Sequence, residues 1–165
     1  MRMTVIVVMG VSGSGKTTIG TALAEALGVE YAEADTFHPK ANIDKMTAGT
    51  PLTDDDRAPW LEAIAGWIRD HQAGGVVTSS ALKRRYRDVL RTGGDVWFAH
   101  LNGPRALLAQ RMKTRTGHFM PVSLLDSQLA DLEPLQPDEP GAVFDIGGTP
   151  AEITEAALTA FREHA

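Results

Sequence analysis

The sequence contains no cysteine and shows no surplus of basic residues. Without cysteine the chain can form neither a disulfide bond nor a thiolate metal site, which fits the reducing cytoplasm, the location we expect. Its 16 Lys and Arg residues are fewer than its 21 Asp and Glu residues, and the formal net charge is -5. Because nucleic-acid backbones and anionic membranes attract basic surfaces, we expect neither to be a partner.

The sequence also lacks a hydrophobic run of membrane-spanning length. The apolar run at residues 5–9 is too short to cross a bilayer, and a glycine-rich loop follows it where a signal peptide would need its cleavage site. We therefore expect no targeting segment. No internal repeat or interdomain linker is visible, and 165 residues fit one compact domain. The prediction is a single domain over residues 1–165.

Apolar runs typical of buried strands alternate along the chain with helical patterns. Residues 4–9 (TVIVVM) are typical of a central strand that is buried on both faces of a parallel sheet. The alternation predicts a three-layer α/β fold, in which helices cover both faces of a parallel sheet of about five strands. The other expected strands are residues 31–34, 76–79, 96–101 and 142–146, and the expected helices include residues 16–27, 60–68, 83–91, 105–115 and 123–132.

The last expected helix has a clear N-terminal signal. Thr149 is placed as the N-cap, Pro150 occupies the first helical position, and Glu152 follows Thr149 by three residues. Thr and Glu at this spacing form a capping box, in which each side chain accepts a hydrogen bond from an otherwise unpaired backbone N–H group. Farther upstream, we assign no helix to the polar stretch that contains Pro39 and Pro51.

A phosphate-binding loop follows the first expected strand. Residues 10–17 read GVSGSGKT, which matches G-x-x-x-x-G-K-[ST] between a strand and a helix. The glycines let backbone N–H groups surround phosphate oxygens, and the helix N-terminus adds its positive dipole end. We expect Lys16 to reach the β and γ phosphates of ATP and Thr17 to bind Mg²⁺. The predicted nucleotide-binding residues here are Gly10, Val11, Ser12, Gly13, Ser14, Gly15, Lys16, Thr17 and Thr18.

The phosphate-binding loop by itself does not define the reaction, because GTPases, motor ATPases and small-molecule kinases share it. The N-K-x-D guanine motif of GTPases does not occur in the sequence, and a large ATPase would need a longer chain. The remaining class is the compact group similar to nucleoside monophosphate kinases, in which the acceptor lies between the second strand and a mobile lid.

Two carboxylates end the second expected strand, at the edge of the sheet where ligands bind in parallel α/β folds. Asp35 is suited to accept a hydrogen bond or a proton from an acceptor hydroxyl, and Glu33 to order water on Mg²⁺. The alternative is an ordinary acidic turn, and spacing alone leaves both interpretations open. His38, taken alone, is more typical of a structural turn than of a ligand.

A series of sequence blocks follows in order along the chain: GVSGSGKTT at 10–18, D-x-x-H-P at 35–39, N-x-x-K-M at 42–46, G-x-P-L-x-D-x-D-R-x-P-W-L at 49–61, S-A-L-K-x-x-Y-R at 80–87, R-x-G-H-F-M at 115–120, S-Q at 127–128 and L-E at 132–133. Through these blocks the sequence resembles the short P-loop gluconokinases over nearly its whole length. Glu33 stands where that family is expected to carry aspartate, and Ser79 where it is expected to carry cysteine.

The resemblance implies ATP- and Mg²⁺-dependent phosphorylation of D-gluconate to 6-phospho-D-gluconate, feeding the pentose phosphate or Entner-Doudoroff pathway, and suggests a homodimer. Gluconate carries a carboxylate at one end and hydroxyls along its length, so its site needs cations and polar groups. Without the resemblance, solvated helix faces and an acidic helix N-terminus explain the same residues. With it, the expected substrate ligands are Asp35, His38, Asn42, Lys45, Asp56, Arg57, Lys83, Arg87 and His118, with Asp54 as a further hydroxyl ligand and Asp55 as a helix cap.

Basic residues near the end of the helix at 105–115 suggest a lid over roughly residues 112–132. Lid closure brings positive charge to the transferred phosphoryl group and excludes water. The alternative is a surface helix whose C-terminus is stabilised by cations. The resemblance favours the lid and assigns Arg111 to the nucleotide and Arg115 to catalysis, together with Lys16 and Asp35. The segment 147–150 resembles an adenine contact.

Two other functions stay open at this point. One is a related kinase that phosphorylates another small polyol or acid, such as shikimate. The other is a nucleotide-binding regulatory module that has the phosphate-binding loop but no turnover.

Overall fold

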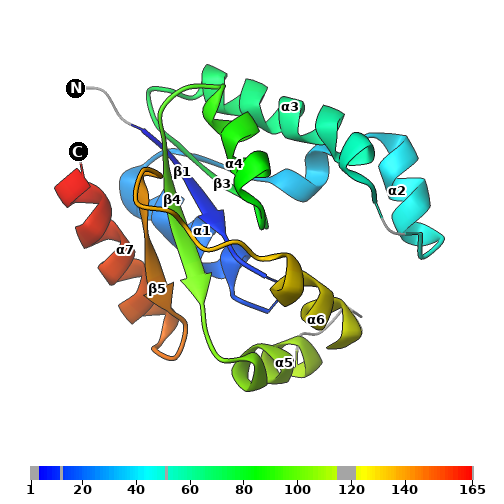
Figure 1. Ribbon diagram of the computed structural model, residues 1–165. Helices are drawn as coiled ribbons and strands as arrows, with labels where there is room; N and C mark the ends of the chain where they lie inside the picture. Colours follow the sequence, from blue (N-terminus) through cyan, green and yellow to red (C-terminus); the bar gives the residue numbers. More distant parts are fainter. Residues whose placement is uncertain (1–3, 12, 51, 115–121, 165) are drawn as a thin grey trace.

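The computed structural model describes residues 4–11, 13–50, 52–114 and 122–164, with backbone alone at residues 35, 46, 112–114 and 122–124. Five parallel strands form one sheet in the order β2-β3-β1-β4-β5 (Figure 1). This architecture confirms the three-layer α/β prediction. The strands are β1 (Val5–Met9), β2 (Glu30–Glu33), β3 (Gly75–Thr78), β4 (Val96–Asn102) and β5 (Gly141–Asp145).

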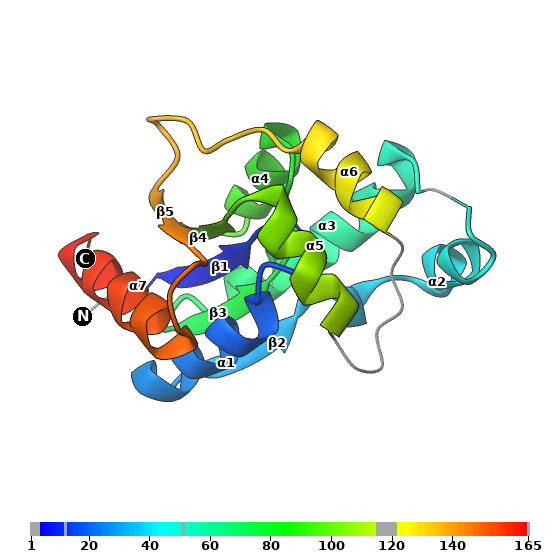
Figure 2. The same ribbon diagram turned by 90° about the horizontal axis from the view of Figure 1, so that it is seen from below.

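Helices cover both faces of the sheet. Side chains of α1 and α7 pack in one core cluster and those of α3 and α4 in another, on the opposite face. Figure 2 shows α5 and α6 together across the carboxyl ends of the strands, near the beginning of α1. The helices are α1 (Lys16–Leu27), the short 3₁₀ turn η1 (Ala34–Phe37), α2 (Lys40–Thr47), α3 (Asp54–Asp70), α4 (Arg84–Arg91), α5 (Arg105–Thr114), α6 (Val122–Asp131) and α7 (Pro150–His164).

Strand β1 is the centre of the molecule. Its five residues are almost completely buried, and they pair with β3 on one side and β4 on the other. Val5, for example, lies opposite both Gly75 and Val96. A continuous run of apolar residues suits this position because both faces of the strand meet a hydrophobic layer. The carboxyl end of β1 therefore opens directly into the phosphate-binding loop.

The structure confirms the predicted capping box of α7 and corrects the predicted cap of α3. At α7 the predicted box forms, because the Thr149 N–H donates to Glu152 and the Glu152 N–H donates to the Thr149 hydroxyl. At α3 the reciprocal pair is Thr53 and Asp56, so the prediction of Asp55 as the cap is wrong. Asp56 stands three residues after Thr53, which is the spacing that lets each side chain reach the other's N–H group.

Helix α2 was not predicted, because it has no apolar stripe. Among the side chains of α2 that the structure describes, Asn42 is the buried one, whereas Ile43 is 48% exposed. Secondary-structure prediction from hydrophobic periodicity needs apolar residues on one face. Helix α2 instead docks through polar contacts.

His100 on β4 is buried, and among the described residues neither ring nitrogen has a hydrogen-bond partner. Burial, together with the nearby positive charge of Arg87, lowers the pKa of His100 to about 4. The imidazole is therefore neutral in the folded protein near neutral pH, whereas in the unfolded chain it gains a proton below about pH 6.5.

We predict that this difference lowers stability as the pH falls from about 6.5 toward 4, because the unfolded state binds the proton first. At pH 5 the loss relative to pH 7 should be about 1–2 kcal/mol from His100 alone. Urea unfolding of the wild type and of His100→Phe at both pH values measures it. A variant with the same pH dependence as the wild type would show that His100 is not responsible.

Candidate active site

The phosphate-binding loop has the backbone geometry that anions require. Gly10 approaches β4 so closely that a Cβ atom there would lie 2.7 Å from the Leu101 carbonyl oxygen, and Gly15 adopts a left-handed conformation with φ of 88°. Gly15 is also the N-cap of α1, so it offers no side chain, and the first turn of α1 contains no acidic residue. The first N–H groups of α1 are therefore available to phosphate oxygens.

Lys16 lies across this loop. Its Nζ donates to the carbonyl oxygens of Gly10 (2.9 Å) and Val11 (3.2 Å). These contacts hold the ammonium group beside the loop before a nucleotide arrives, where an electrostatic role in phosphoryl transfer needs it. Ser12 lies outside the described residues.

A cavity of about 300 Å³ adjoins the beginning of α1. Its lining includes Thr17 and Thr18 of α1, Arg111 of α5 and Pro150 of α7. The guanidinium of Arg111 is fixed in part by a hydrogen bond to the Ile146 carbonyl oxygen (2.7 Å). Gly148 also lines the cavity, so the segment after β5 contributes to its wall.

The Thr17 hydroxyl and the Glu33 carboxylate meet where α1 begins and β2 ends. Thr17 Oγ1 donates to Glu33 Oε1 at 2.8 Å, and the Tyr31 hydroxyl donates to the same oxygen at 3.1 Å. Burial raises the pKa of Tyr31, as does the adjacent Glu33 charge, so Tyr31 remains a donor. Because the Thr17 proton points to Glu33, its oxygen lone pairs are available to a cation. The described residues contain no cluster of three or more His, Cys, Asp or Glu that could hold a metal without phosphate.

The segment after β2 is fixed by the aromatic ring of Trp60. Trp60 Nε1 donates to the Ala34 carbonyl oxygen (2.6 Å), and the His38 ring stacks on the indole with centroids 4.3 Å apart. Asn42 is buried and donates to the Asp56 carbonyl oxygen at 2.8 Å. These contacts hold η1 and α2 against α3. The backbone of Asp35 lies in η1, whereas its side chain is outside the described part of the structure.

Two expected substrate ligands pair with each other. Lys45 Nζ contacts both carboxylate oxygens of Asp56 at 2.8 Å, and Asp56 also accepts from the Thr53 N–H. The Lys45 hydrogen bond is the main reason that the pKa of Asp56 falls to about 2. Lys45 therefore brings no surplus charge to the acceptor side in this structure, because Asp56 already neutralises it.

Arg57 and Lys83 converge on Tyr86, a residue that sequence reasoning did not single out. The Arg57 guanidinium carbon and the Lys83 ammonium lie 5.6 and 5.9 Å from the centre of the Tyr86 ring. Arg57 comes from the first turn of α3, and Lys83 is the N-cap of α4. The fold thus brings together two cations that the sequence proposed separately as carboxylate ligands. Asp54, an expected hydroxyl ligand, accepts instead from the Tyr86 hydroxyl (2.7 Å).

Arg87 requires a correction. It was expected to bind the substrate, but it has no exposed surface, and its Nε and Nη2 donate to the buried carboxylate of Glu139 at 2.6 and 3.0 Å. Its remaining donors contact the carbonyl oxygens of Ala81, Leu82 and Pro134. A guanidinium with every donor group used inside the protein is not available to a ligand. The sequence showed the charge of Arg87 but not its partner, 52 residues away.

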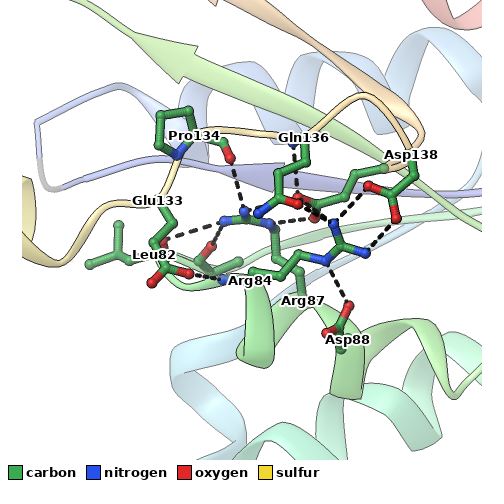
Figure 3. Close-up of polar contacts among 10 residues, drawn as sticks. Leu82, Arg84, Arg87, Asp88, Glu133, Pro134, Gln136 and Asp138 are labelled. Atoms are coloured by element: carbon green, nitrogen blue, oxygen red, sulfur yellow. Dashed lines mark hydrogen bonds and ion pairs between the residues drawn. The ribbon is translucent and has the colours of Figure 1, made fainter.

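The pair of Arg87 and Glu139 clamps the connector between α6 and β5, residues 132–140, onto the beginning of α4 (Figure 3). Burial favours the protonated form of Glu139, but the hydrogen bond from Arg87 and the backbone contact with Gln136 outweigh it, so the pKa of Glu139 is lowered. Arg84 adds a second contact to the connector through Asp138. The clamp fixes the turn that precedes Lys83.

We predict that Arg87→Met destabilises the protein by about 3–5 kcal/mol, because it leaves the Glu139 charge buried without a partner. Urea unfolding measures the loss. Arg105→Ala is the matched control, since its ion pair with Asp126 is about half exposed and its removal should cost much less. A variant of normal stability that has lost only acceptor affinity would restore Arg87 as a substrate ligand.

Residues 115–121 of the expected lid lie outside the described part of the chain. Arg115 and His118 are not among the described residues, so their roles stay predictions. The helices on either side of this gap, α5 and α6, contact each other through the ion pair of Arg105 with Asp126, whose shortest distance is 2.6 Å.

Of the helices described, none is long and apolar enough to cross a membrane.

Comparison with known proteins supports the kinase interpretation. Residues 12–132 match the family model described as shikimate kinase. A gluconokinase from Gluconobacter oxydans is 53% identical over 82% of this chain and 78% of its own. The crystal structure of a gluconokinase from Sinorhizobium meliloti has a TM-score of 0.89 at 48% identity, covering 97% of this chain and 92% of that one. Shikimate kinase from Aquifex aeolicus shares the fold, with a TM-score of 0.64, at 13% identity over 96% of each chain.

Proposed function

Since the chain belongs to the gluconokinase family, within the P-loop kinases related to shikimate kinase, we propose that it transfers the γ-phosphoryl group of ATP to the terminal hydroxyl of D-gluconate. The products are ADP and 6-phospho-D-gluconate. The observation that carries the proposal is the position of Arg57 and Lys83, which gather on the acceptor side of a fold whose first helix begins at the phosphate-binding loop. Arg57 and Lys83 can bind the carboxylate of an anionic acceptor, and the N–H groups of the phosphate-binding loop can bind the phosphates of ATP.

Lys16 and the N–H groups of α1 act on the nucleotide. Phosphoryl transfer is loose, and charge builds on the oxygens around the transferred group, so fixed positive groups contribute most of the stabilisation. Lys16 exchanges its contacts with Gly10 and Val11 for the β and γ oxygens of ATP. The base of ATP lies in the adjoining cavity, whose wall includes Arg111 and Pro150.

Mg²⁺ fits the pair of Thr17 and Glu33. Thr17 Oγ1 would ligate the ion, while Glu33 would accept the hydrogen bond of the Thr17 hydroxyl and order a water on the metal. When bound, Mg²⁺ would supply positive charge that offsets the charge of the ATP phosphates. Thr17 and Glu33 orient the oxygens that receive the ion, and Lys16 completes the positive surroundings of the phosphates.

Asp35 orients the acceptor hydroxyl. Its backbone lies in η1, which directly follows β2 and is anchored to α3 by Trp60. Because the transition state is loose, the nucleophile needs little early deprotonation, so positioning contributes alongside proton acceptance. His38 and Asn42 hold the same segment in place. The gluconate carboxylate binds farther along the site, at Arg57 and Lys83.

An acceptor panel tests the function. ADP release with D-gluconate, shikimate and nucleosides, each at saturating ATP and Mg²⁺, should show turnover with gluconate and little above background with the others. Lys16→Ala is the inactive control, with turnover lowered about 10³-fold or more. Faster turnover with shikimate would favour the related kinase, and no turnover with any acceptor would favour a regulatory module.

We predict that Glu33→Gln raises the Mg²⁺ concentration needed for half-maximal rate about tenfold, because a neutral amide orders metal-bound water less strongly. The KM for gluconate should change little. Titration of initial rates with Mg²⁺ at fixed ATP measures the effect. Glu33→Asp, which keeps the charge, should recover most of the loss, and an unchanged Mg²⁺ dependence in Glu33→Gln would remove Glu33 from the metal site.

We also predict that Asp35→Asn separates proton acceptance from positioning. The amide keeps one acceptor oxygen but takes no proton at neutral pH, so a base role lowers turnover by about 10²–10⁴-fold with gluconate affinity largely kept. If Asp35 only positions the acceptor hydroxyl, the loss of turnover in Asp35→Asn should be smaller. Steady-state kinetics decide between the two, and turnover equal to the wild type would exclude Asp35 from catalysis.

A further inference from the structure

Tyr86 lies at the centre of a charged cluster that joins α3 to α4. Its ring is buried, and its hydroxyl donates to Asp54 Oδ1 at 2.7 Å while it accepts from Arg57 Nη1 at 3.2 Å. Arg57 and Asp54 belong to the first turn of α3, and Tyr86 to the first turns of α4. A single hydroxyl thus bonds to both a cation and an anion of the neighbouring helix.

Three cations surround the Tyr86 ring. The Arg57, Lys83 and Arg85 head groups lie 5.6, 5.9 and 5.6 Å from its centre, within the range of cation–π attraction. Such attraction keeps positive groups close together that would otherwise repel one another. The ring therefore lowers the cost of concentrating positive charge at this place.

Carboxylates in the cluster do not balance this charge. Asp54 contacts Arg85 at 2.5 Å and Arg57 at 3.9 Å, whereas within the described residues no carboxylate reaches Lys83. The hydrogen bond from Tyr86, followed by the charges of Arg85 and Lys83, lowers the pKa of Asp54, which is therefore ionised near neutral pH. The single negative charge of Asp54 leaves two of the three positive charges around Tyr86 without a counter-charge. The ion pair of Lys45 with Asp56 is neutral and does not change this balance.

We propose that Tyr86 is a specificity-determining positioning residue, which holds Arg57 and Lys83 together so that the site selects an acidic acceptor over a neutral polyol of the same length. The inference rests on the proposed function, because gluconate supplies the carboxylate that offsets the surplus charge. Tyr86 acts through the two cations, since its hydroxyl is occupied by Asp54 and Arg57 and its ring by the cationic groups. The Asp54 carboxylate competes weakly for the same cations until the acceptor binds.

Tyr86→Phe tests the proposal, because it keeps the ring and removes the hydroxyl. The KM for gluconate should rise about tenfold, with kcat and the KM for ATP within about twofold of the wild type. The inhibition constant of D-glucitol, which has the terminal hydroxyl but no carboxylate, should stay unchanged. An unchanged KM for gluconate would overturn the proposal, as would equal losses for gluconate and glucitol.

Asp54→Asn separates positioning of the cations from simple support of the fold. The amide still accepts the Tyr86 hydrogen bond but removes the competing charge, so the KM for gluconate should stay the same or fall. A rise that matches Tyr86→Phe would show that the contact is only structural and would overturn the proposal. Wild-type enzyme without gluconate turnover would overturn the proposed function and this inference together, whereas an active wild type with an unaltered Tyr86→Phe variant contradicts this inference alone.

Discussion

The parallel pairing of β1 with β3 and β4 is the constraint on which the rest of the molecule depends. Because all five strands run the same way, the phosphate-binding loop after β1, the η1 segment after β2 and the turn after β3 open on one edge of the sheet. The close approach of Gly10 to the Leu101 carbonyl oxygen ties the loop to β4 as well. Groups for the nucleotide and for the acceptor are thus placed by one sheet.

The acceptor half needs a second support, because Lys83, one of its two cations, follows a turn with an unfavourable backbone conformation. Ala81 has a φ of 43°, the one positive value for a non-glycine residue in the described part of the chain. Such a conformation costs about 1–3 kcal/mol and persists where its surroundings hold it. Arg87 donates to the Ala81 carbonyl oxygen, and Glu139 holds Arg87. The buried ion pair therefore supports Lys83 and Tyr86 rather than the ligand itself.

Local patterns in the sequence predicted the fold and the place of the phosphate-binding loop between β1 and α1. The apolar run of β1, the GVSGSGKT loop and the capping box of α7 can each be recognised from a few neighbouring residues. The acceptor half depends on contacts between distant segments. The charge of Arg87 suggested a substrate ligand. The sequence did not show its pairing with Glu139, which lies in the acidic connector between α6 and β5.

Other parts of the acceptor half have no local signal. The role of Tyr86 depends on α3 and α4 meeting, which the sequence does not show. Helix α2 docks through Asn42, a polar residue that hydrophobic periodicity overlooks. The pattern S-A-L-K-x-x-Y-R does contain Tyr86, so a search for aromatic residues among clustered cations would have found this residue.

The proposed reaction moves the γ-phosphoryl group of ATP to the terminal hydroxyl of D-gluconate. Two-dimensional ³¹P–¹H NMR of the products formed from ATP and D-gluconate tests it directly. We expect one phosphate ester, whose phosphorus is coupled to the protons of the terminal carbon, formed in equal amount with ADP. An ester at another hydroxyl, or ADP accompanied by inorganic phosphate in place of the ester, would contradict it.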